Sequence, residues 1–433
     1  MDSSYGPLCR EEKEENPMAV VKPFKCVRPN RKEAALVAAL PYDVYNRKEA
    51  ALVTAANPKS FLNIDRPETQ FPPEMDMYDD RVYQKAAELL NAWIADGTFV
   101  ADGLEAYYIY ELTMDGRTQT GIVACSSVDD YVNGVIKKHE NTREEKEIDR
   151  IRHVDTTDAQ TGPIFLAYRS SETINKLVAL KTGTAPLYDF TADDGIRHRV
   201  WEVDNADSIL TIEEAFAAVP ATYIADGHHR AASAVKVALK RREENPGYTG
   251  KEPFNYFLSV LFPDEQLMIM PYNRVVKDLN GLSKEEFLSR AEEAGFIVTC
   301  LGNEPFAPEV KGTFGMYLDG KWYRLKAGKA LCSDDPVKGL DVSVLQDYLL
   351  GPILGIGDPR TDKRIDFIGG IRGLSELEKR CGEDMEVAFS MYPTSIQELF
   401  DVADAGLLMP PKSTWFEPKL RSGLFIHRLS EEK

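Results

Sequence analysis

The feature that most constrains the fold of this chain is a short apolar segment that runs, through two residues, into an alanine-rich helix. Residues 221–225 (ATYIA) are typical of a buried strand, and residues 228–242 have the composition of a helix. Asp226 and Gly227 lie between them, and a glycine at this point lets the backbone turn sharply. Because other strand-like and helix-like segments alternate along the chain, we predict a mixed α/β (α+β) fold.

The length and the pattern of the sequence predict two domains. A chain of 433 residues can bury two separate cores. We expect a long charged helix over residues 131–152, and a new run of strands and helices after Pro263. The predicted organisation is a flexible N-terminus (1–18), a first domain that carries the site (19–265), a smaller second domain (266–408) and a tail (409–433). The sequence leaves open whether this tail returns to the first domain.

The charge balance limits the possible partners. The chain has 70 acidic and 52 basic side chains, and its net charge of -18 disfavours binding to nucleic acid or to anionic membranes. No apolar run is long enough to predict a transmembrane helix or a signal peptide. The six cysteines form no CxxC pair, as expected of reduced thiols. We therefore expect a cytoplasmic protein that binds neither nucleic acid nor a membrane.

The turn Asp226-Gly227-His228-His229-Arg230 is the strongest candidate for an active site. The free N–H groups and the dipole at a helix start attract an anion, and Arg230 opposes that dipole unless an anion binds beside it. One of the two histidines can carry a proton or bind a metal, and Asp226 can hold magnesium or orient a histidine. The alternative is an ordinary helix cap, but the preceding strand and the small residues 231–234 favour a phosphate site.

A second candidate group precedes the charged stretch. Glu140, next to His139, can take a proton from a hydroxyl nucleophile. Thr142 can cap a helix or contact a phosphate. The alternative is a solvated helical face, because residues 143–147 continue as ordinary i,i+4 partners.

Other candidates lie far apart in the sequence. One group is Lys412, Ser413 and Thr414, whose ammonium and two hydroxyls can bind a phosphate. The alternative is that this segment only packs its aromatic neighbours onto a core. Arg274 is a candidate for the phosphates, and Tyr42, Asp43, Arg66 and Asn273 are candidates for the substrate; each can equally belong to a turn or to a surface ion pair. No zinc-type cluster, Walker motif, serine-hydrolase elbow or dinucleotide fingerprint occurs.

Several strings resemble known families. DGHHR after an apolar strand is similar to the signature of the ParB/sulfiredoxin superfamily, and especially to its free-serine kinases. Over nearly its whole length the chain resembles a large bacterial family, domain-of-unknown-function family 1015, in the strings PYDVY (41–45), NPKSFLNIDRPE (57–68), IKKHENTREEKEIDR (136–150), TGPIFLAY (161–168), IADGHHRAASA (224–234), YNRVVKDLNGLS (272–283) and MPPKSTWFEPKLRSGL (409–424). The resemblance implies a ParB/sulfiredoxin-like core, elaborated with a second, smaller α+β domain.

The resemblance also implies a function. It indicates a phosphotransferase that uses ATP or ADP with Mg²⁺ on a small hydroxylated metabolite, with free serine as the first candidate. The catalytic groups would then be Glu140, as the base, with His139, Asp226, His228 and His229; Asp226 would place the magnesium, and the phosphates would lie on Gly227, Arg230, Thr142, Lys412, Ser413, Thr414 and Arg274. Two alternatives stay open: a phosphatase acting on phosphoserine or a nucleotide, and a non-catalytic ParB-like regulator that binds nucleotide or nucleic acid. A homodimer is also compatible with the sequence.

Overall fold

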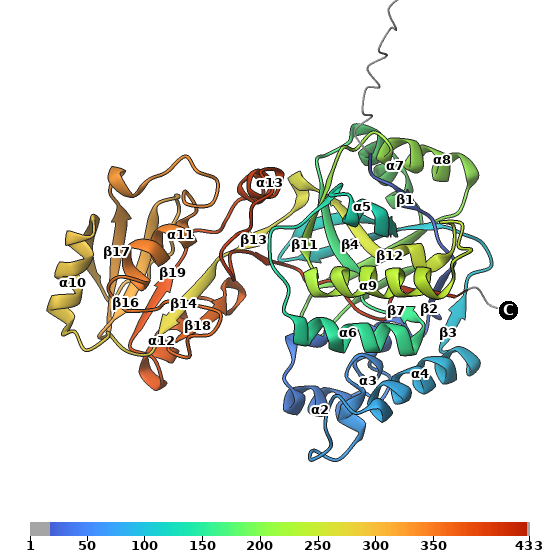
Figure 1. Cartoon of the computed structure of the whole chain (residues 1–433), viewed down its shortest axis with the longest axis horizontal. Helices are drawn as coiled ribbons and strands as arrows, with labels where there is room; N and C mark the ends of the chain where they lie inside the picture. The colour runs from blue at the N-terminus through green and yellow to red at the C-terminus, as the bar shows by residue number, and fades with distance from the viewer. Residues whose placement is uncertain (1–17, 431–433) are drawn as a thin grey trace, which may run out of the picture.

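The computed structural model describes residues 18–430 of the chain, which form two lobes (Figure 1). Apart from Met18, the N-terminus that the sequence predicts to be flexible (1–18) lies outside the described residues. Each lobe is built on a β-sheet with helices packed against it. The predicted mixed α/β fold class is therefore confirmed.

The larger lobe is built on a mixed sheet that is buried on both faces. In spatial order its strands are β6 (Ile136–Lys137), β11 (Thr222–Asp226), β8 (Ile164–Tyr168), β12 (Tyr256–Pro263), β5 (Arg117–Ser127), β4 (Tyr107–Met114), β10 (Arg197–Val203) and β9 (Tyr188–Thr191), and β1 (Val21–Lys22) pairs with β5. Successive side chains of β4 enter different cores: Tyr107 and Ile109 pack on one face, and Tyr108 and Tyr110 on the other. Burial of both faces explains why these strands read as nearly continuous apolar runs.

Helices cover the first of these faces. They are α7 (Glu172–Thr182), α8 (Ala206–Phe216) and α9 (His228–Glu244), together with the short α5 (Val128–Val132). The small side chains Ala231, Ala234 and Ala238 let α9 lie close to the sheet. A further helix, α6 (Glu144–Thr157), packs alongside α9. The start of α9 therefore lies where β11, α6 and the following loops meet.

The N-terminal region forms a separate layer beneath α6. Its helices are α1 (Ala34–Val37), α2 (Arg47–Ala56), α3 (Leu62–Asp65) and α4 (Asp80–Ala95). A small sheet of β3 (Phe99–Ala101), β2 (Cys26–Pro29), β21 (Ile426–Arg428) and β7 (Ala159–Gln160) joins this layer to the end of the chain. The tail thus returns to the first lobe, where Phe416 and Phe425 also enter the core of the large sheet.

The second lobe is an antiparallel sheet inserted into the chain of the first. Its strands are, in spatial order, β15 (Phe296–Gly302), β17 (Lys321–Ala327), β16 (Thr313–Leu318), β19 (Val387–Ser390), β14 (Tyr272–Val276) and β18 (Ile365–Gly369), and its helices are α10 (Lys284–Glu293), α11 (Asp341–Leu345) and α12 (Leu374–Glu383). The chain enters this lobe after β13 (Ile269–Met270) and returns before β20 (Trp415–Phe416), and these two strands pair with each other.

The helix α13 (Ile396–Asp404) binds the first lobe at the edge of its sheet. The ring of Phe400 stacks on Tyr223 of β11, with 3.9 Å between the ring centroids. Asp404 accepts hydrogen bonds from Lys137, Arg169 and Tyr223 at 2.6, 2.7 and 2.8 Å. The strand that ends in Asp226 is therefore held from outside the first sheet.

The long charged helix expected over residues 131–152 is wrong. The segment instead forms α5, the edge strand β6 and a loop before α6 begins at Glu144. Gly134 follows α5 with a φ of +77°, a conformation that ends the helix, and β6 then pairs with β11. His139 and Glu140 consequently lie on a loop beside the end of β11. Within residues 18–430, no helix combines the length and the apolarity that crossing a membrane requires.

Candidate active site

The sequence leaves the first backbone N–H groups of α9 without a capping side chain. Gly227 precedes the helix with a φ of +93°, no side chain caps the helix, and no acidic residue lies in its first turn. A Cβ atom at Gly227 would lie 3.0 Å from Nε and Nη2 of Arg230, so both the backbone and the neighbouring guanidinium require a glycine. The open N–H groups and the helix dipole make this end attractive to an anion.

Asp226 lies beside this helix start between two cations. Its Oδ2 is 3.5 Å from Nζ of Lys419 and 3.6 Å from Nη2 of Arg230, while Oδ1 accepts a hydrogen bond from the backbone N–H of Gly227 at 3.0 Å. Burial acts to raise the pKa of Asp226, but Lys419, Arg230 and His228 outweigh it and hold that pKa at about 2. The carboxylate is therefore ionised at neutral pH.

Arg230 is anchored by the strand next to β11. Its Nη1 donates to the carbonyl oxygen of Pro163 at 2.6 Å, and its side chain is only 12% exposed. The guanidinium is thus fixed with its Nε–Nη2 edge over Gly227 and Nη2 also nearest Asp226, while Nη1 is turned to Pro163. A guanidinium held in one position can bind phosphate oxygens with little loss of side-chain freedom.

Two buried imidazoles lie against each other behind the turn. The rings of His139 and His228 meet edge to face, with 4.5 Å between centroids, and both residues are buried. Nδ1 of His139 and Nε2 of His228 have no hydrogen-bond partner among residues 18–430. Burial lowers the pKa of His139 to about 4 and that of His228 well below its ordinary value, so both rings are neutral at pH 7.

The loop that carries Glu140 lies against the same turn. Nε2 of His229 accepts a hydrogen bond from the backbone N–H of Arg143 at 3.0 Å. Burial, followed by the charge of Lys146, lowers the pKa of His229, which leaves that ring neutral as the bond requires. Glu140 is half-buried, and burial raises its pKa; Lys412 opposes this shift and Asp226 adds to it. A carboxylate with a raised pKa is suited to accept a proton.

The tail supplies the third segment of the site. The backbone N–H of Met409 donates to the carbonyl oxygen of His139 at 2.8 Å, and Oγ1 of Thr414 lies 3.4 Å from Nε2 of the same residue. Lys412 is exposed on this segment. Three segments that are far apart in the sequence, 139–143, 226–230 and 409–419, therefore meet at the start of α9.

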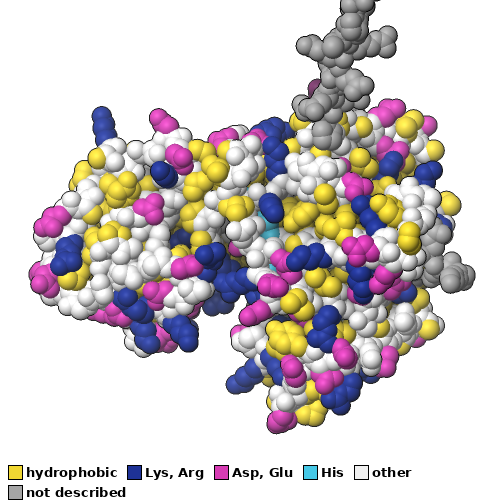
Figure 2. Space-filling model, in the orientation of Figure 1, with side chains coloured by type: hydrophobic (Ala, Val, Ile, Leu, Met, Phe, Trp, Pro, Cys, Tyr) yellow, Lys and Arg dark blue, Asp and Glu magenta, His cyan; other side chains and the backbone are white. Residues whose placement is uncertain are grey.

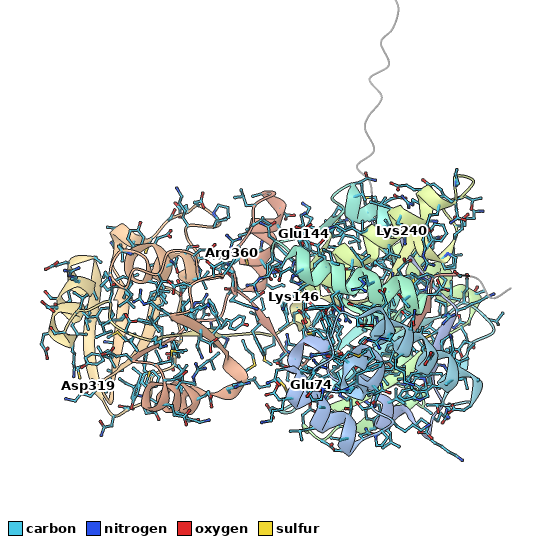
Figure 3. The ribbon with its side chains drawn as sticks, turned by 60° about the horizontal axis from the view of Figure 1, so that its bottom comes forward. Glu74, Glu144, Lys146, Lys240, Asp319 and Arg360 are labelled. Carbon is cyan, nitrogen blue, oxygen red and sulfur yellow. The ribbon has the colours of Figure 1, made fainter. Side chains whose placement is uncertain are left out.

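Positive charge gathers where the two lobes meet, on a chain that is acidic as a whole. Figure 2 shows Lys and Arg side chains around this notch, with histidine visible inside it. Lys146 and Arg360 lie on opposite sides of the junction in Figure 3, and Nη2 of Arg143 reaches the carbonyl oxygen of Arg360 at 3.4 Å. Because the chain as a whole has a net charge of -18, this local gathering of Lys and Arg side chains favours an anionic ligand.

Several predicted site residues have side chains engaged elsewhere. Oγ1 of Thr142 donates to Glu147, and Oγ of Ser413 donates to the carbonyl oxygen of Pro410 at 2.6 Å. The buried Arg274 donates to the carbonyl oxygens of Tyr272 and Lys412, and Oδ1 of the buried Asn273 accepts from the N–H of Met391 at 3.0 Å. The structure does not bring Arg274 and Asn273 to the start of α9; Arg274 instead supports the loop that carries Lys412.

The predicted substrate residues near the N-terminus border a neighbouring pocket. Arg66 is buried, pairs with Glu68 at 2.5 Å and donates to the carbonyl oxygens of Tyr42 and Tyr45 at 2.9 and 2.6 Å. It lines the pocket together with Tyr42 and Asp43. Arg66 therefore shapes the turn at residues 41–45, and its charge is already paired.

Two residues at the site were missed from the sequence. Lys419 contacts Asp226 from 193 residues away, and its Nζ lies 4.8 Å from the centroid of the Trp415 ring. Arg150 is buried beside Tyr42, with its guanidinium carbon 4.0 Å from the ring centroid. The only signal for either was its place inside a string that resembles a family, WFEPK for Lys419 and EKEIDR for Arg150.

The site offers few ligands for a metal. Across residues 18–430, no three His, Cys, Asp or Glu side chains lie close enough together to hold an ion. Asp226 is ionised and one-third exposed, with Glu140 nearby. This donor set fits Mg²⁺ that takes most of its ligands from phosphates and water, and it does not fit a structural metal.

Comparison with known proteins then places the chain in a family. A family model described as protein of unknown function (DUF1015) matches residues 21–343. The chain belongs to the DUF1015 family. The family resemblance drawn from the sequence strings is therefore confirmed.

Solved structures show weaker likenesses to this DUF1015 chain. A free serine kinase in complex with AMP is 15% identical, with a TM-score of 0.34 over 70% of this chain and 91% of the other. A conserved hypothetical protein from Pyrococcus furiosus is 16% identical, with a TM-score of 0.33 over 70% and 94%. SbnI from Staphylococcus aureus, truncated at its C-terminus, is 11% identical, with a TM-score of 0.35 over 69% and 85%. No curated protein matches the chain.

Proposed function

We propose that this protein is a phosphotransferase that moves a phosphoryl group from ATP or ADP to the hydroxyl group of a small metabolite, with free serine as the first candidate. The observation that carries the proposal is the uncapped start of α9, faced by the anchored guanidinium of Arg230 and the ammonium of Lys419. Open N–H groups and fixed cations are what a transferring phosphoryl group needs, because catalysis of this reaction is largely positioning and charge neutralisation.

Each residue at the turn has a role in this reaction. The acceptor oxygen forms a bond to phosphorus while the bond from phosphorus to the nucleotide oxygen breaks, and the acceptor proton passes to Glu140. Arg230, Lys412 and Lys419 bind the phosphate oxygens and offset their charge. Asp226 would hold a Mg²⁺ ion, which when bound adds positive charge beside the phosphates. The raised pKa of Glu140 supports its role as the base.

The two buried imidazoles act as positioning residues in this proposal. Both are neutral, and their edge-to-face packing fixes His139, and with it Glu140, against the first residue of α9. Their unpartnered nitrogens are available to a bound ligand or to water. His229 fixes the same loop through the N–H of Arg143.

A phosphate-transfer assay tests the proposal. The protein is incubated with Mg²⁺, with ATP, ADP or pyrophosphate as donor, and with hydroxylated acceptors led by L-serine. We expect phosphoserine to form, and we expect Arg230→Ala to lose about 30-fold or more of the activity, since truncating one partner of a buried charge pair costs about 2–5 kcal/mol. Arg242→Ala, at the other end of α9, is the matched control and should keep full activity.

Other results would replace the proposal. Release of phosphate from phosphoserine without a nucleotide would instead establish a phosphatase, since both reactions need the same phosphate pocket. Salt-sensitive retention on DNA without any turnover would favour a binding protein.

A further inference from the structure

A small pocket opens on the side of Arg230 that faces α6. Asp65 of α3, Arg150 of α6 and Thr161 line it, together with Tyr42 and Arg230. The cavity volume is about 30 Å³, and the space around it is partly open to solvent. The pocket thus begins next to the proposed phosphate site and ends between two oppositely charged side chains.

The cationic wall of the pocket is a buried guanidinium with a free edge. Arg150 is 7% exposed, and its Nε and Nη2 lie 2.9 and 2.8 Å from Oδ2 of Asp149. The ring of Tyr42 holds the guanidinium flat at 4.0 Å. Within residues 18–430, Nη1 of Arg150 makes no hydrogen bond, although the residue lines the pocket. A planar group fixed in this way can donate to a carboxylate.

The anionic wall is a buried carboxylate without a cationic partner. Asp65 is 3% exposed, and Oδ1 accepts a hydrogen bond from Oγ1 of Thr161 at 2.9 Å. Among the described residues no lysine, arginine or histidine forms an ion pair with Asp65, although Arg150 lines the same pocket. A buried charge is usually paired, because leaving it unpaired is costly.

A nearby ion pair shows that the same region can pair its buried charges. Arg66, the next residue after Asp65, is 8% exposed and bonds Glu68 at 2.5 Å. Asp65 and Arg150, by contrast, face one pocket with a gap between them. A ligand that carries both charges can bridge this gap, whereas a simple anion would be repelled by Asp65 and a simple cation by Arg150.

We propose that this pocket binds a small zwitterion, an α-amino acid, with its ammonium group on Asp65 and its carboxylate on Arg150. The side chain of the bound amino acid then points toward Arg230, at the end of the pocket next to the proposed phosphate site. The proposal rests on the proposed function only for the fate of that side chain: a hydroxyl at this end is the group that would receive the phosphoryl group.

The test is a binding measurement by calorimetry on the full chain without nucleotide. L-serine is compared with ethanolamine, which lacks the carboxylate, and with D- and L-glycerate, in which a hydroxyl replaces the ammonium group. We expect L-serine to bind and each analogue to bind at least about tenfold more weakly, because ethanolamine leaves Nη1 of Arg150 without an acceptor and glycerate leaves Asp65 without a cation. Equal binding of ethanolamine or glycerate, or no binding of L-serine, would overturn the proposal.

Two variants test whether Asp65 and Arg150 bind the two charged groups of the amino acid. Asp65→Asn keeps an acceptor for Thr161 and should weaken L-serine binding at least about tenfold. Arg150→Met should do the same. Arg152→Met changes a half-buried arginine two residues along α6 that pairs with Asp80, and this variant should bind like the wild type. If either buried variant does not fold, the comparison of ligands on the wild-type protein still decides the proposal.

The same measurements separate this proposal from the proposed function. Binding of L-serine without phosphoryl transfer to it would support the pocket and contradict the phosphotransferase. Transfer to a hydroxylated acceptor that lacks the ammonium group, at the rate found with L-serine, would support the phosphotransferase and overturn the pocket.

Discussion

The start of α9 and the start of α10 both present free backbone N–H groups, but their N-cap residues treat these groups in opposite ways. At α10, Oγ of Ser283 accepts from the N–H of Glu286 at 3.2 Å, and Glu286 accepts from the N–H of Ser283 at 2.8 Å. At α9, Gly227 offers no side chain, and the first turn carries two histidines and an arginine. A helix whose own residues satisfy its free N–H groups has nothing left to bind with, whereas α9 keeps these groups available.

This availability has a cost that the rest of the lobe must offset. A capping side chain contributes about 1 kcal/mol, and a buried polar atom without a partner costs roughly 1–3 kcal/mol. The start of α9 lacks a capping side chain. The adjacent His139 and His228 each have a buried nitrogen without a hydrogen-bond partner among the described residues. A bound anion, or water around it, can accept from the free N–H groups and bond to the unpartnered nitrogens, which would offset part of both costs. This is a physical reason to expect ligand binding at α9 and none at α10.

The largest effect is expected from the carboxylate that faces the open helix end. Glu140→Gln removes the proposed base and should lower turnover by about 10²–10⁴-fold, as measured in the phosphate-transfer assay. Glu144→Gln, an exposed neighbour at the start of α6, is the control and should be fully active. Because ionising a carboxyl with a raised pKa costs stability as the pH rises, Glu140→Gln should be at least as heat-stable at pH 7. Unchanged turnover would remove Glu140 from the reaction.

The pH dependence of activity should show the titration of the Glu140 carboxyl. The raised pKa of Glu140 means that it binds a proton at a mildly acidic pH at which an ordinary glutamate is still ionised. Activity should therefore fall about tenfold per pH unit below that pKa, and Glu140→Gln should lose this acid limb. Asp226, with its pKa at about 2, should not contribute to the limb. An acid limb retained in Glu140→Gln would assign the titration to another group.

Two glycine substitutions separate backbone strain from loss of the site. Gly227 and Gly281 both have positive φ, +93° and +77°, so alanine should cost each about 1–3 kcal/mol of stability in a denaturant titration. Only at Gly227 would the new Cβ meet Arg230, at 3.0 Å, whereas nothing lies within 4 Å of it at Gly281. We expect Gly227→Ala to lose activity and Gly281→Ala to keep it. Equal activity of the two variants would show that the position of Arg230 is not critical.

The smallest effect is expected at the capped helix. Ser283→Ala removes one half of the capping box and should cost about 1 kcal/mol, seen as faster hydrogen exchange over α10. Phosphoryl transfer should not change, because α10 lies in the second lobe, on the far side from the notch (Figure 1). A loss of activity comparable to that of Gly227→Ala would contradict the contrast between the two helix ends.

The local units of the fold could be predicted from the sequence, because their signals are local. The segment ATYIA-DG followed by alanines gives β11, the turn and α9 within two residues of the predicted ends. The hairpin at Asp115-Gly116 and the helix α4 follow from equally short patterns. The helix predicted over 131–152 is present only from Glu144, where α6 begins. The prediction failed before that residue, because the pairing of β6 with β11 is a tertiary interaction that no local pattern contains.

The candidate site could be predicted only in part. The residues of the turn itself are adjacent in the sequence, so their chemistry was visible there. The contact of Lys419 with Asp226, and the gap between Asp65 and Arg150, depend on segments brought together by β21, α3 and α6. Thr142 and Arg274 have the right chemical type, but their hydrogen bonds to Glu147 and to backbone carbonyls depend on packing that the sequence does not reveal.

The pairing of β21 with β2 and β7 has a consequence for when the candidate site is completed during synthesis. The strands that bracket the first lobe come from opposite ends of the described chain, and the whole second lobe is made between them. While the ribosome is still making the second lobe, the large sheet lacks Phe416 and Phe425 from its core, and the turn at the start of α9 lacks Lys419. Nascent chains should therefore hold α9 with the candidate anion site incomplete, and the site should be completed in one late step, when residues 409–428 emerge and close the small sheet.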